Sequence, residues 1–99
     1  MVYFIVSVFE NPGQGRGSYE DYIRLVKPIV ERHGGTYLVR SDHVVPLSDA
    51  WTPSRVIVIR FETREQLDRC FGSEEYRAIA GKRENAVDAR AVIVEEEAP

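Results

Sequence analysis

Two arginines are the residues of this sequence best suited to hold a ligand. Arg40 ends a predicted strand and Arg55 begins another, so we expect both guanidinium groups at a rim of the sheet near Trp51. A planar guanidinium group beside an aromatic ring suits a carboxylate or a polar aromatic ligand. The alternative is that each arginine pairs with an aspartate of the chain itself: Asp42, Asp49 or Asp88.

His43 is a candidate acid or base near neutral pH at the rim of the same site. Its neighbours Ser41 and Asp42 complete the residue types of a hydrolase triad. Consecutive residues do not converge on one reacting atom, however, so we interpret residues 41–43 as a turn. His33 closes a predicted helix, where the helix dipole favours a cation, and that position explains it without a catalytic role.

The remaining reactive residue types do not form a metal or cofactor site. Two histidines and one distant cysteine are a poor set of ligands, so we expect no metal and no cofactor. Gly13, Gly15 and Gly17 run from a strand into a helix but lack the G-x-G-x-x-G spacing, because position 18 is serine. Phosphate binding at the start of that helix is the alternative to a plain loop.

Other side chains of chemical interest are predicted to belong to the core. Cys70 shares an apolar helical stripe with Leu67 and Phe71, which favours a small buried side chain over a nucleophile. Three tyrosines are either core aromatics, which is the default, or hydroxyl groups that line a pocket: Tyr3, Tyr37 and Tyr76.

The composition indicates an ordinary soluble protein with a single domain over residues 1–99. Hydrophobic residues make up 43% and charged residues 29%, and a net charge of −3 argues against non-specific binding to nucleic acid or to an anionic membrane. The apolar N-terminal run is too short to span a bilayer and lacks the basic residues of a secretory signal. Because the one cysteine cannot form an internal disulfide, we expect a cytoplasmic location.

Hydrophobic periodicity predicts the elements that position these residues. Strands are expected over residues 2–9, 36–40, 55–61 and 89–94, with a short returning strand or an arm at 44–47. Helices are expected over residues 18–33, 63–71 and 74–82.

Local signals mark the helix ends. Thr63 and Gln66 match a capping box, Ser73 is placed to cap the third helix, and Ser18 with Asp21 resembles a capping box at the first. Gly34-Gly35 is predicted to end the first helix, because glycine accepts the left-handed turn found there. Pro28 lies inside that helix and is expected to kink it or shift its pairing.

The order β-α-β-(short β)-β-α-β predicts an α+β fold of the ferredoxin-like, split βαβ type. In that arrangement, the helices of both β-α-β halves lie on one face of an antiparallel sheet. The short segment RVIVIRF is apolar on both faces, with Ile57 and Ile59 on one side and Val56 and Val58 on the other. The first and last strands show the same property, so the helices leave one apolar face uncovered.

That uncovered face predicts self-association. Four strands about 4.8 Å apart and about 20 Å long present a face of about 400 Å². An exposed apolar patch of that size is at the limit that soluble monomers tolerate. The same face of a second copy, packed about a two-fold axis, is the simplest cover, so we expect a homodimer. Arg60 shares this face with Val56 and Val58 and is expected to reach a carboxylate of the partner. The alternative is a monomer that covers the face with its own loops or tail.

Several segments together resemble the domain of unknown function 1330 family of the dimeric α/β-barrel superfamily. They are HGGTYLVRSDHVVPL, WTPSRVIVIRF, SEEYRAIAGKRENAVDA and the last strand. The resemblance extends over nearly the whole chain and implies a ferredoxin-like protomer and a dimer. It implies no activity, because the family is largely uncharacterised.

Three functional hypotheses remain open. The first is a homodimeric protein that binds a small acidic or aromatic molecule near Arg40, Trp51 and Arg55. The second rests on the resemblance, whose superfamily includes monooxygenases, isomerases and haem-handling enzymes: a cofactor-independent enzyme with His43 as acid or base and Arg40 as anion stabiliser. The haem variant lacks a convincing axial histidine. The third is a purely structural module that only associates with itself.

Overall fold

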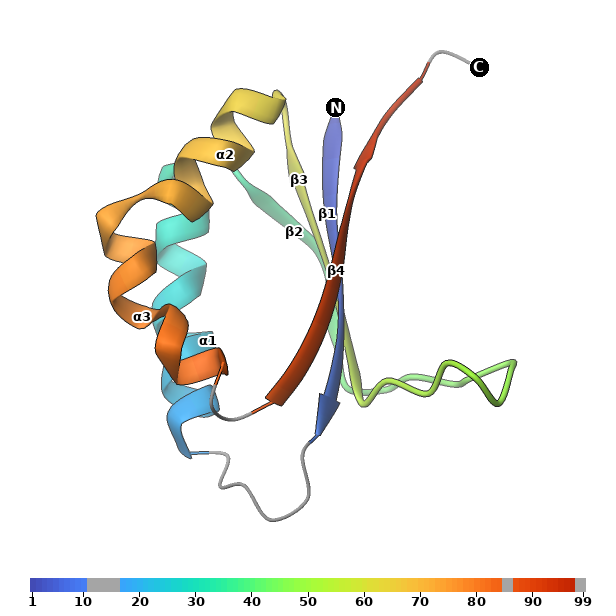
Figure 1. Cartoon of the computed structure of the whole chain (residues 1–99). Coiled ribbons are helices and arrows are strands. Elements are labelled where there is room, and N and C mark those ends of the chain that lie inside the picture. Colours follow the sequence, from blue (N-terminus) through green and yellow to red (C-terminus); the bar gives the residue numbers. More distant parts are fainter. Residues whose placement is uncertain (11–16, 85–86, 98–99) are drawn as a thin grey trace.

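In the part of the chain that the structure describes, three helices lie on one side of a four-stranded antiparallel sheet (Figure 1). The computed structural model describes residues 1–10, 17–84 and 87–97. Along the chain the elements are β1 (Val2–Glu10), α1 (Gly17–Arg32), β2 (Thr36–Ser41), β3 (Arg55–Phe61), α2 (Arg64–Gly72), α3 (Glu74–Glu84) and β4 (Val87–Glu95). The strand order β2-β3-β1-β4 with antiparallel pairing confirms the predicted α+β, ferredoxin-like fold.

The predicted elements are confirmed with small differences at their ends. β3 has the predicted bounds, whereas β4 begins two residues earlier and ends one residue later than residues 89–94. The predicted short strand at residues 44–47 is wrong, because these residues pair with none of the described strands. They belong to an irregular projection, residues 42–54, which we call the arm. The prediction named an arm as the other possibility, and that possibility holds.

Capping explains where the helices begin and end. Thr63 and Gln66 form the predicted capping box at α2, and Ser73 Oγ accepts the backbone N–H of Tyr76 at 3.2 Å in α3. Gly34 adopts the left-handed conformation (φ 88°) that closes α1, as predicted. α1 begins at Gly17, so Ser18 lies inside the helix rather than at its N-cap. The glycine-rich loop and its phosphate hypothesis fall largely on residues 11–16, outside the described residues.

The core lies between the sheet and the helices. Alternate residues of the central strands face the helices and are buried, for example Val6 and Val8 of β1 and Ile57 and Ile59 of β3. α1 contributes an apolar stripe at helical spacing: Tyr19, Tyr22, Val26, Ile29 and Val30. Among the described helices, none is both long and apolar enough to cross a membrane.

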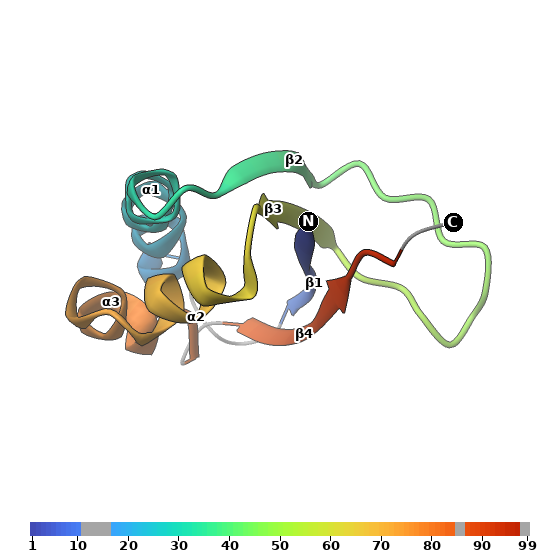
Figure 2. The ribbon, with the colours of Figure 1, turned by 90° about the horizontal axis from the view of Figure 1, so that it is seen from above.

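The opposite face of the sheet, which we call the open face, carries none of the described helices. From above, the helices lie to one side of the sheet and the arm extends to the other (Figure 2). The open face presents the other alternate residues, among them Tyr3, Ile5, Val58, Val92 and Val94. Val92 is 57% exposed and Val94 is 44% exposed. The prediction that the sheet is apolar on both faces is therefore confirmed.

Candidate functional site

A cavity of about 120 Å³ lies on the helix side of the sheet. Side chains of β1 and β3 form its floor, including Val6, Val8, Ile57 and Ile59, and Ile23 and Val26 of α1 line it from the helical layer. Such a concave and mainly apolar space with a few polar groups is typical of small-molecule sites. This cavity is therefore the candidate functional site.

The polar lining of the cavity consists of tyrosines and arginines. They are Tyr19, Tyr22, Tyr37, Tyr76, Arg40 and Arg83. Among the described lining residues there is no carboxylate, amide or imidazole. Guanidinium groups only donate hydrogen bonds and carry positive charge, and a phenol can donate as well. The lining therefore favours a ligand that accepts hydrogen bonds.

A β-bulge places Arg40 on the cavity side. Tyr37 pairs with Ile59 and Arg40 with Ile57, so both face the helices, although residues three apart on a regular strand face opposite sides. The register shifts between Tyr37 and Val39, and this leaves Leu38 as an extra residue. As a result the Arg40 guanidinium lies 5.5 Å from the centre of the Tyr37 ring.

Tyr22 and Tyr76 meet across the helical layer. Their hydroxyl oxygens are 3.0 Å apart, and both side chains are buried, with 8% and 9% exposure. Burial, with a further contribution from Tyr76, raises the pKa of Tyr22 above its ordinary value. Burial also raises the pKa of Tyr37, to about 12, although Arg40 opposes this shift. Tyr22 and Tyr37 therefore stay protonated at neutral pH.

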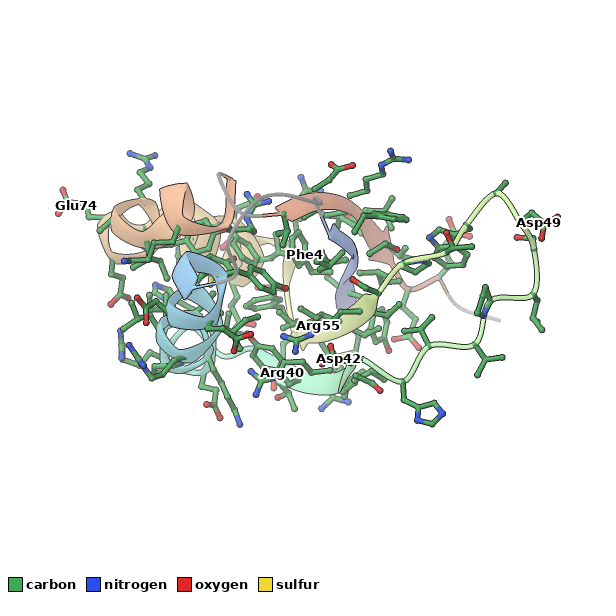
Figure 3. All side chains as sticks on the ribbon, turned by 90° about the horizontal axis from the view of Figure 1, so that it is seen from below. Phe4, Arg40, Asp42, Asp49, Arg55 and Glu74 are labelled. Carbon is green, nitrogen blue, oxygen red and sulfur yellow. The ribbon has the colours of Figure 1, made fainter. Side chains whose placement is uncertain are left out.

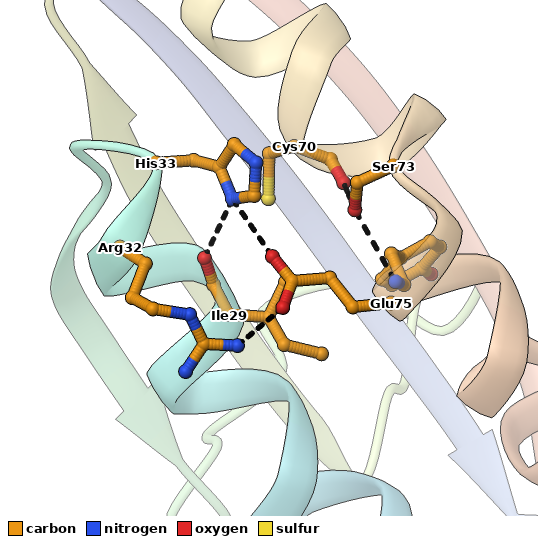
Figure 4. Close-up of polar contacts among 7 residues, drawn as sticks. Ile29, Arg32, His33, Cys70, Ser73 and Glu75 are labelled. Carbon is orange, nitrogen blue, oxygen red and sulfur yellow. Dashed lines mark hydrogen bonds and ion pairs between the residues drawn. The ribbon is translucent and has the colours of Figure 1, made fainter.

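The first turn of α3 is fixed in a way that positions Tyr76. Ser73 Oγ donates to the carbonyl of Cys70 at 2.7 Å and accepts the N–H of Tyr76 (Figure 4). Glu75, the residue before Tyr76, forms an ion pair with Arg32, and its other carboxylate oxygen lies 3.7 Å from His33 Nδ1 at the end of α1. These contacts hold the start of α3 against α1, so the ring of Tyr76 reaches that of Tyr22.

Of the predicted site residues, Arg40 lines the cavity and the others lie outside its lining. Arg55 pairs with Asp42, with Nη2 to Oδ2 at 3.0 Å, which is the predicted structural alternative (Figure 3). Hydrogen bonding to Asp42 raises the pKa of Arg55. The structure thus brings Arg40 and Arg55 to one end of the sheet but gives them different partners.

The other two predicted site residues belong to the arm. Trp51 Nε1 donates to Ser7 Oγ at 3.1 Å, and Ser7 lies on the open face. His43 is exposed, and its backbone N–H donates to Ser41 Oγ at 3.0 Å, in keeping with the predicted turn. Trp51 and His43 therefore lie outside the cavity lining that includes Arg40.

Cys70 and His33 are accounted for by packing. Cys70 is fully buried, and burial raises the pKa of its thiol to about 11, as expected of a core side chain rather than a nucleophile. His33 Nδ1 lies 2.9 Å from the carbonyl oxygen of Ile29 in the last turn of α1. This is the helix-end position that the sequence predicted.

Three polar lining residues were not singled out from the sequence as site residues, namely Tyr19, Tyr22 and Arg83. Tyr22 belongs to the apolar stripe of α1 and was assigned to the core with it. Its hydroxyl was the available signal, because a buried phenol requires a polar partner. Arg83 lies near the end of α3, where a cation is explained by the helix dipole alone.

Comparisons with known proteins agree with the fold. The model of a family described as a domain of unknown function, DUF1330, matches residues 2–97. A protein of unknown function from Rhodopseudomonas palustris has a TM-score of 0.81 at 18% identity, over 99% of this chain and 83% of that chain. SnoaB, a cofactor-independent oxygenase from Streptomyces nogalater, has a TM-score of 0.68 at 12% identity, over 99% and 94%. No curated protein matches the sequence.

Proposed function

Because the chain belongs to the DUF1330 family, whose description assigns no activity, we propose a function from the cavity: it binds a small molecule with an apolar, ring-sized body and an acidic group. The observation that carries this proposal is the lining, which combines an apolar floor with Arg40, Arg83 and tyrosine hydroxyls but no described carboxylate. An apolar cavity of about 150 Å³ accepts a benzene ring, so this cavity of about 120 Å³ has room for at most one ring, with the acidic group of the ligand at its mouth.

Arg40 is the proposed anion-binding residue. A guanidinium group can bind a carboxylate with two parallel hydrogen bonds, and Arg40, which lines the cavity but is exposed, would do so at the mouth of the cavity. Arg40 also lies over the ring of Tyr37, which limits the side-chain entropy lost when a ligand binds. Arg55 is less suited to this role, because Asp42 already occupies its guanidinium group.

Titration with benzoate, followed by NMR, tests the proposal. We expect shifts of cavity residues in the wild type and a loss of affinity of about tenfold or more in Arg40→Met, since a hydrogen bond to a charged group contributes about 1.5–3 kcal/mol. Arg77→Met is the matched control, because Arg77 is an exposed arginine of α3 outside the lining. Equal losses in both variants, or no shifts in the wild type, would contradict the proposal.

The enzyme hypothesis gains no support from the cavity. Its described lining contains no histidine, aspartate or glutamate that could accept a proton. His43, the sequence-based candidate, is exposed on the arm. Binding is therefore the function that we propose.

We further propose that the open face packs against the same face of a second copy. A stable interface buries about 800 Å² on each partner, whereas the sheet alone presents about 400 Å². The arm supplies further apolar surface on that side of the sheet, with Val45 72%, Leu47 99% and Trp51 55% exposed. Its direction in Figures 1 and 2 would bring it alongside a copy seated on the open face.

Sedimentation equilibrium at micromolar concentration tests the dimer. We expect a dimer for the wild type, with association weakened at least about tenfold in Val45→Ser/Leu47→Ser, because burying each side chain contributes about 1.5–3 kcal/mol. Leu25→Ser is the control, since Leu25 is an exposed leucine of α1 on the helix side. A folded wild-type monomer would overturn the proposal, and equal effects of the arm and control variants would remove the arm from it.

A cytoplasmic location is also part of the proposal. It rests on the sequence, whose one cysteine is buried in the core and therefore requires no oxidising compartment. Cell fractionation with a tagged chain tests it, and recovery from an oxidising compartment would contradict it.

A further inference from the structure

The two hydroxyl groups of Tyr22 and Tyr76 share one hydrogen bond but carry two protons. They lie 3.0 Å apart in the cavity wall, and either oxygen can be the donor of that bond. Whichever tyrosine donates, the other keeps its own proton for a second hydrogen bond. Among the described residues, no acceptor for this second proton lies within hydrogen-bonding distance.

A buried donor without an acceptor is destabilising, so the second proton has a strong preference for any acceptor that enters the cavity. Both side chains are more than nine-tenths buried, which leaves the cavity as the space into which this proton can point. The Arg83 guanidinium lines the same cavity and favours a partial negative charge there.

We propose that the Tyr22–Tyr76 pair donates a hydrogen bond into the cavity and selects ligands whose ring carries an acceptor oxygen, such as an aryl ketone. This inference rests on the proposed function, because it specifies a second polar contact in the same cavity. It assigns Arg40 to the acidic group of the ligand and the tyrosine pair to an uncharged carbonyl oxygen. A ligand that combines the two is a small aromatic keto acid.

The packing of the two rings makes this recognition specific. The rings of Tyr22 and Tyr76 lie edge to face with centroids 6.3 Å apart, and Phe71 packs edge to face on Tyr76 at 4.9 Å. The Ser73 cap fixes the backbone of Tyr76. Because rings and backbone are held on several sides, the two hydroxyl oxygens keep their positions in the cavity wall, and the donor is preorganised for a ligand.

The experiment compares two neutral ligands of nearly the same shape, acetophenone and α-methylstyrene. The second has a methylene group in place of the carbonyl oxygen of the first. Neither carries a charge, so an ion pair with Arg40 does not contribute to the difference. We expect the wild type to bind acetophenone about three- to tenfold more tightly, which corresponds to one neutral hydrogen bond. Equal affinities for the two ligands in the wild type would overturn the proposal.

The informative variant is Tyr22→Phe/Tyr76→Phe. A single substitution frees the hydroxyl of the other tyrosine to donate into the cavity, so the single variants are expected to keep much of the preference. The double variant removes both donors and leaves no unsatisfied partner, so both rings and the fold are expected to be retained. We expect it to bind the two ligands equally, and a preference for acetophenone that persists would contradict the proposal.

A second measurement needs only the wild type. The signal of acetophenone labelled with ¹³C at the carbonyl carbon is expected to move downfield on binding, because a donated hydrogen bond polarises the carbonyl. A bound signal at the position seen in apolar solvent would contradict the proposal.

Benzoate binding distinguishes a failure of this inference from a failure of the proposed function. If benzoate binds through Arg40 and the protein shows no preference for acetophenone over α-methylstyrene, the anion site stands and the tyrosine inference fails. If neither benzoate nor acetophenone binds, the proposed function fails.

Discussion

The two faces of the sheet have the same apolar character but different covers. On β3, Ile59 faces the helices and is 4% exposed, whereas its neighbour Val58 faces the other side, where no described helix lies. On β4, Val87 is 5% exposed and Val92 is 57% exposed. The strand sequences therefore make both faces of the sheet apolar, but the positions of the helices determine which face the chain covers by itself.

The polar groups of the two faces also differ. The helix side holds a cavity with phenols and guanidinium groups in its wall, whereas the open face holds charged residues at its edges, including Arg60, Arg90 and Asp88. Arg90 lies 5.0 Å from the centre of the Phe9 ring. A closed face with internal donors is suited to a small ligand, and a broad apolar face with charged edges is suited to a protein surface.

The largest expected effect comes from placing aspartate on each face of β3. Ile59→Asp buries a charge without a partner in the core, and we expect a loss of more than about 4 kcal/mol, enough to unfold a domain of this size. Val58→Asp places the same charge on the open face. We expect this variant to stay folded but to lose the ability to associate.

Circular dichroism and sedimentation equilibrium together check this pair. An Ile59→Asp variant with native thermal stability would show that the helix side is not the core. A dimeric Val58→Asp variant would show that the open face is not the interface. If both variants unfold, the open face is part of the folding unit, as in an obligate dimer.

Alkaline pH is expected to destabilise the helix side selectively. Burial raises the pKa of Cys70 from 9.0 to about 11, that of Tyr37 from 10.0 to about 12, and that of Tyr22 above 10.0. The unfolded chain therefore loses these protons first. The contribution of these groups to the free energy of unfolding is fully present well below pH 9. It is lost as pH rises, by about 1.4 kcal/mol per pH unit for each group that titrates only in the unfolded chain.

Urea unfolding at a series of pH values measures this dependence. Tyr37→Phe removes one of the groups, so its stability is expected to fall less steeply than that of the wild type between pH 10 and 12. Parallel curves for the two proteins would mean that Tyr37 ionises as easily in the folded state as in the unfolded chain.

The sequence predicted the fold well because the relevant signals are local. Runs of β-branched and aromatic residues marked β1 and β3. Thr63, Gln66, Ser73 and Gly34 each carry a side chain or a backbone preference that acts within a few residues. The arm lacks such a signal. Val44 to Leu47 has the composition of a strand, but the described residues offer it no neighbouring strand, and pairing depends on that neighbour.

The site was harder to predict, because its geometry depends on register and on contacts between distant elements. Arg40 faces the cavity owing to a bulge at Leu38, which alternation alone does not reveal. The Tyr22–Tyr76 bond joins α1 to α3, and its residues lie 54 positions apart. Arg55 and Trp51 have the right chemistry, but Asp42 and Ser7 are their partners.

A smaller effect is expected at Gly35, which lies between α1 and β2. A Cβ atom at Gly35 would lie 2.5 Å from Val30 Cγ1 and 2.9 Å from the Phe61 ring. Both neighbours are fully buried, so Gly35→Ala is expected to cost about 1–3 kcal/mol through overpacking. Gly81→Ala is the control, because nothing lies within 4 Å of its Cβ position and alanine favours a helix by about 1 kcal/mol. Thermal unfolding checks the pair, and a stable Gly35→Ala variant would show that Phe61 moves aside.

The smallest effect concerns the root of the arm on the open face. Trp51→Phe keeps an aromatic ring but removes the donor to Ser7 Oγ, and we expect a loss of about 0.5–1.5 kcal/mol. Ser7 is 7% exposed, so its hydroxyl needs this partner. Ser7→Ala and the double variant complete a double-mutant cycle measured by urea unfolding. A coupling free energy near zero between the two substitutions would mean that the position of the arm does not depend on the Trp51–Ser7 bond. Faster cleavage of the arm by protease in Trp51→Phe than in the wild type would show that it does. An arm that is already held in place loses less conformational entropy when a second copy binds. The hydrogen bond from Trp51 to Ser7 would therefore favour association, although its own contribution to stability is small.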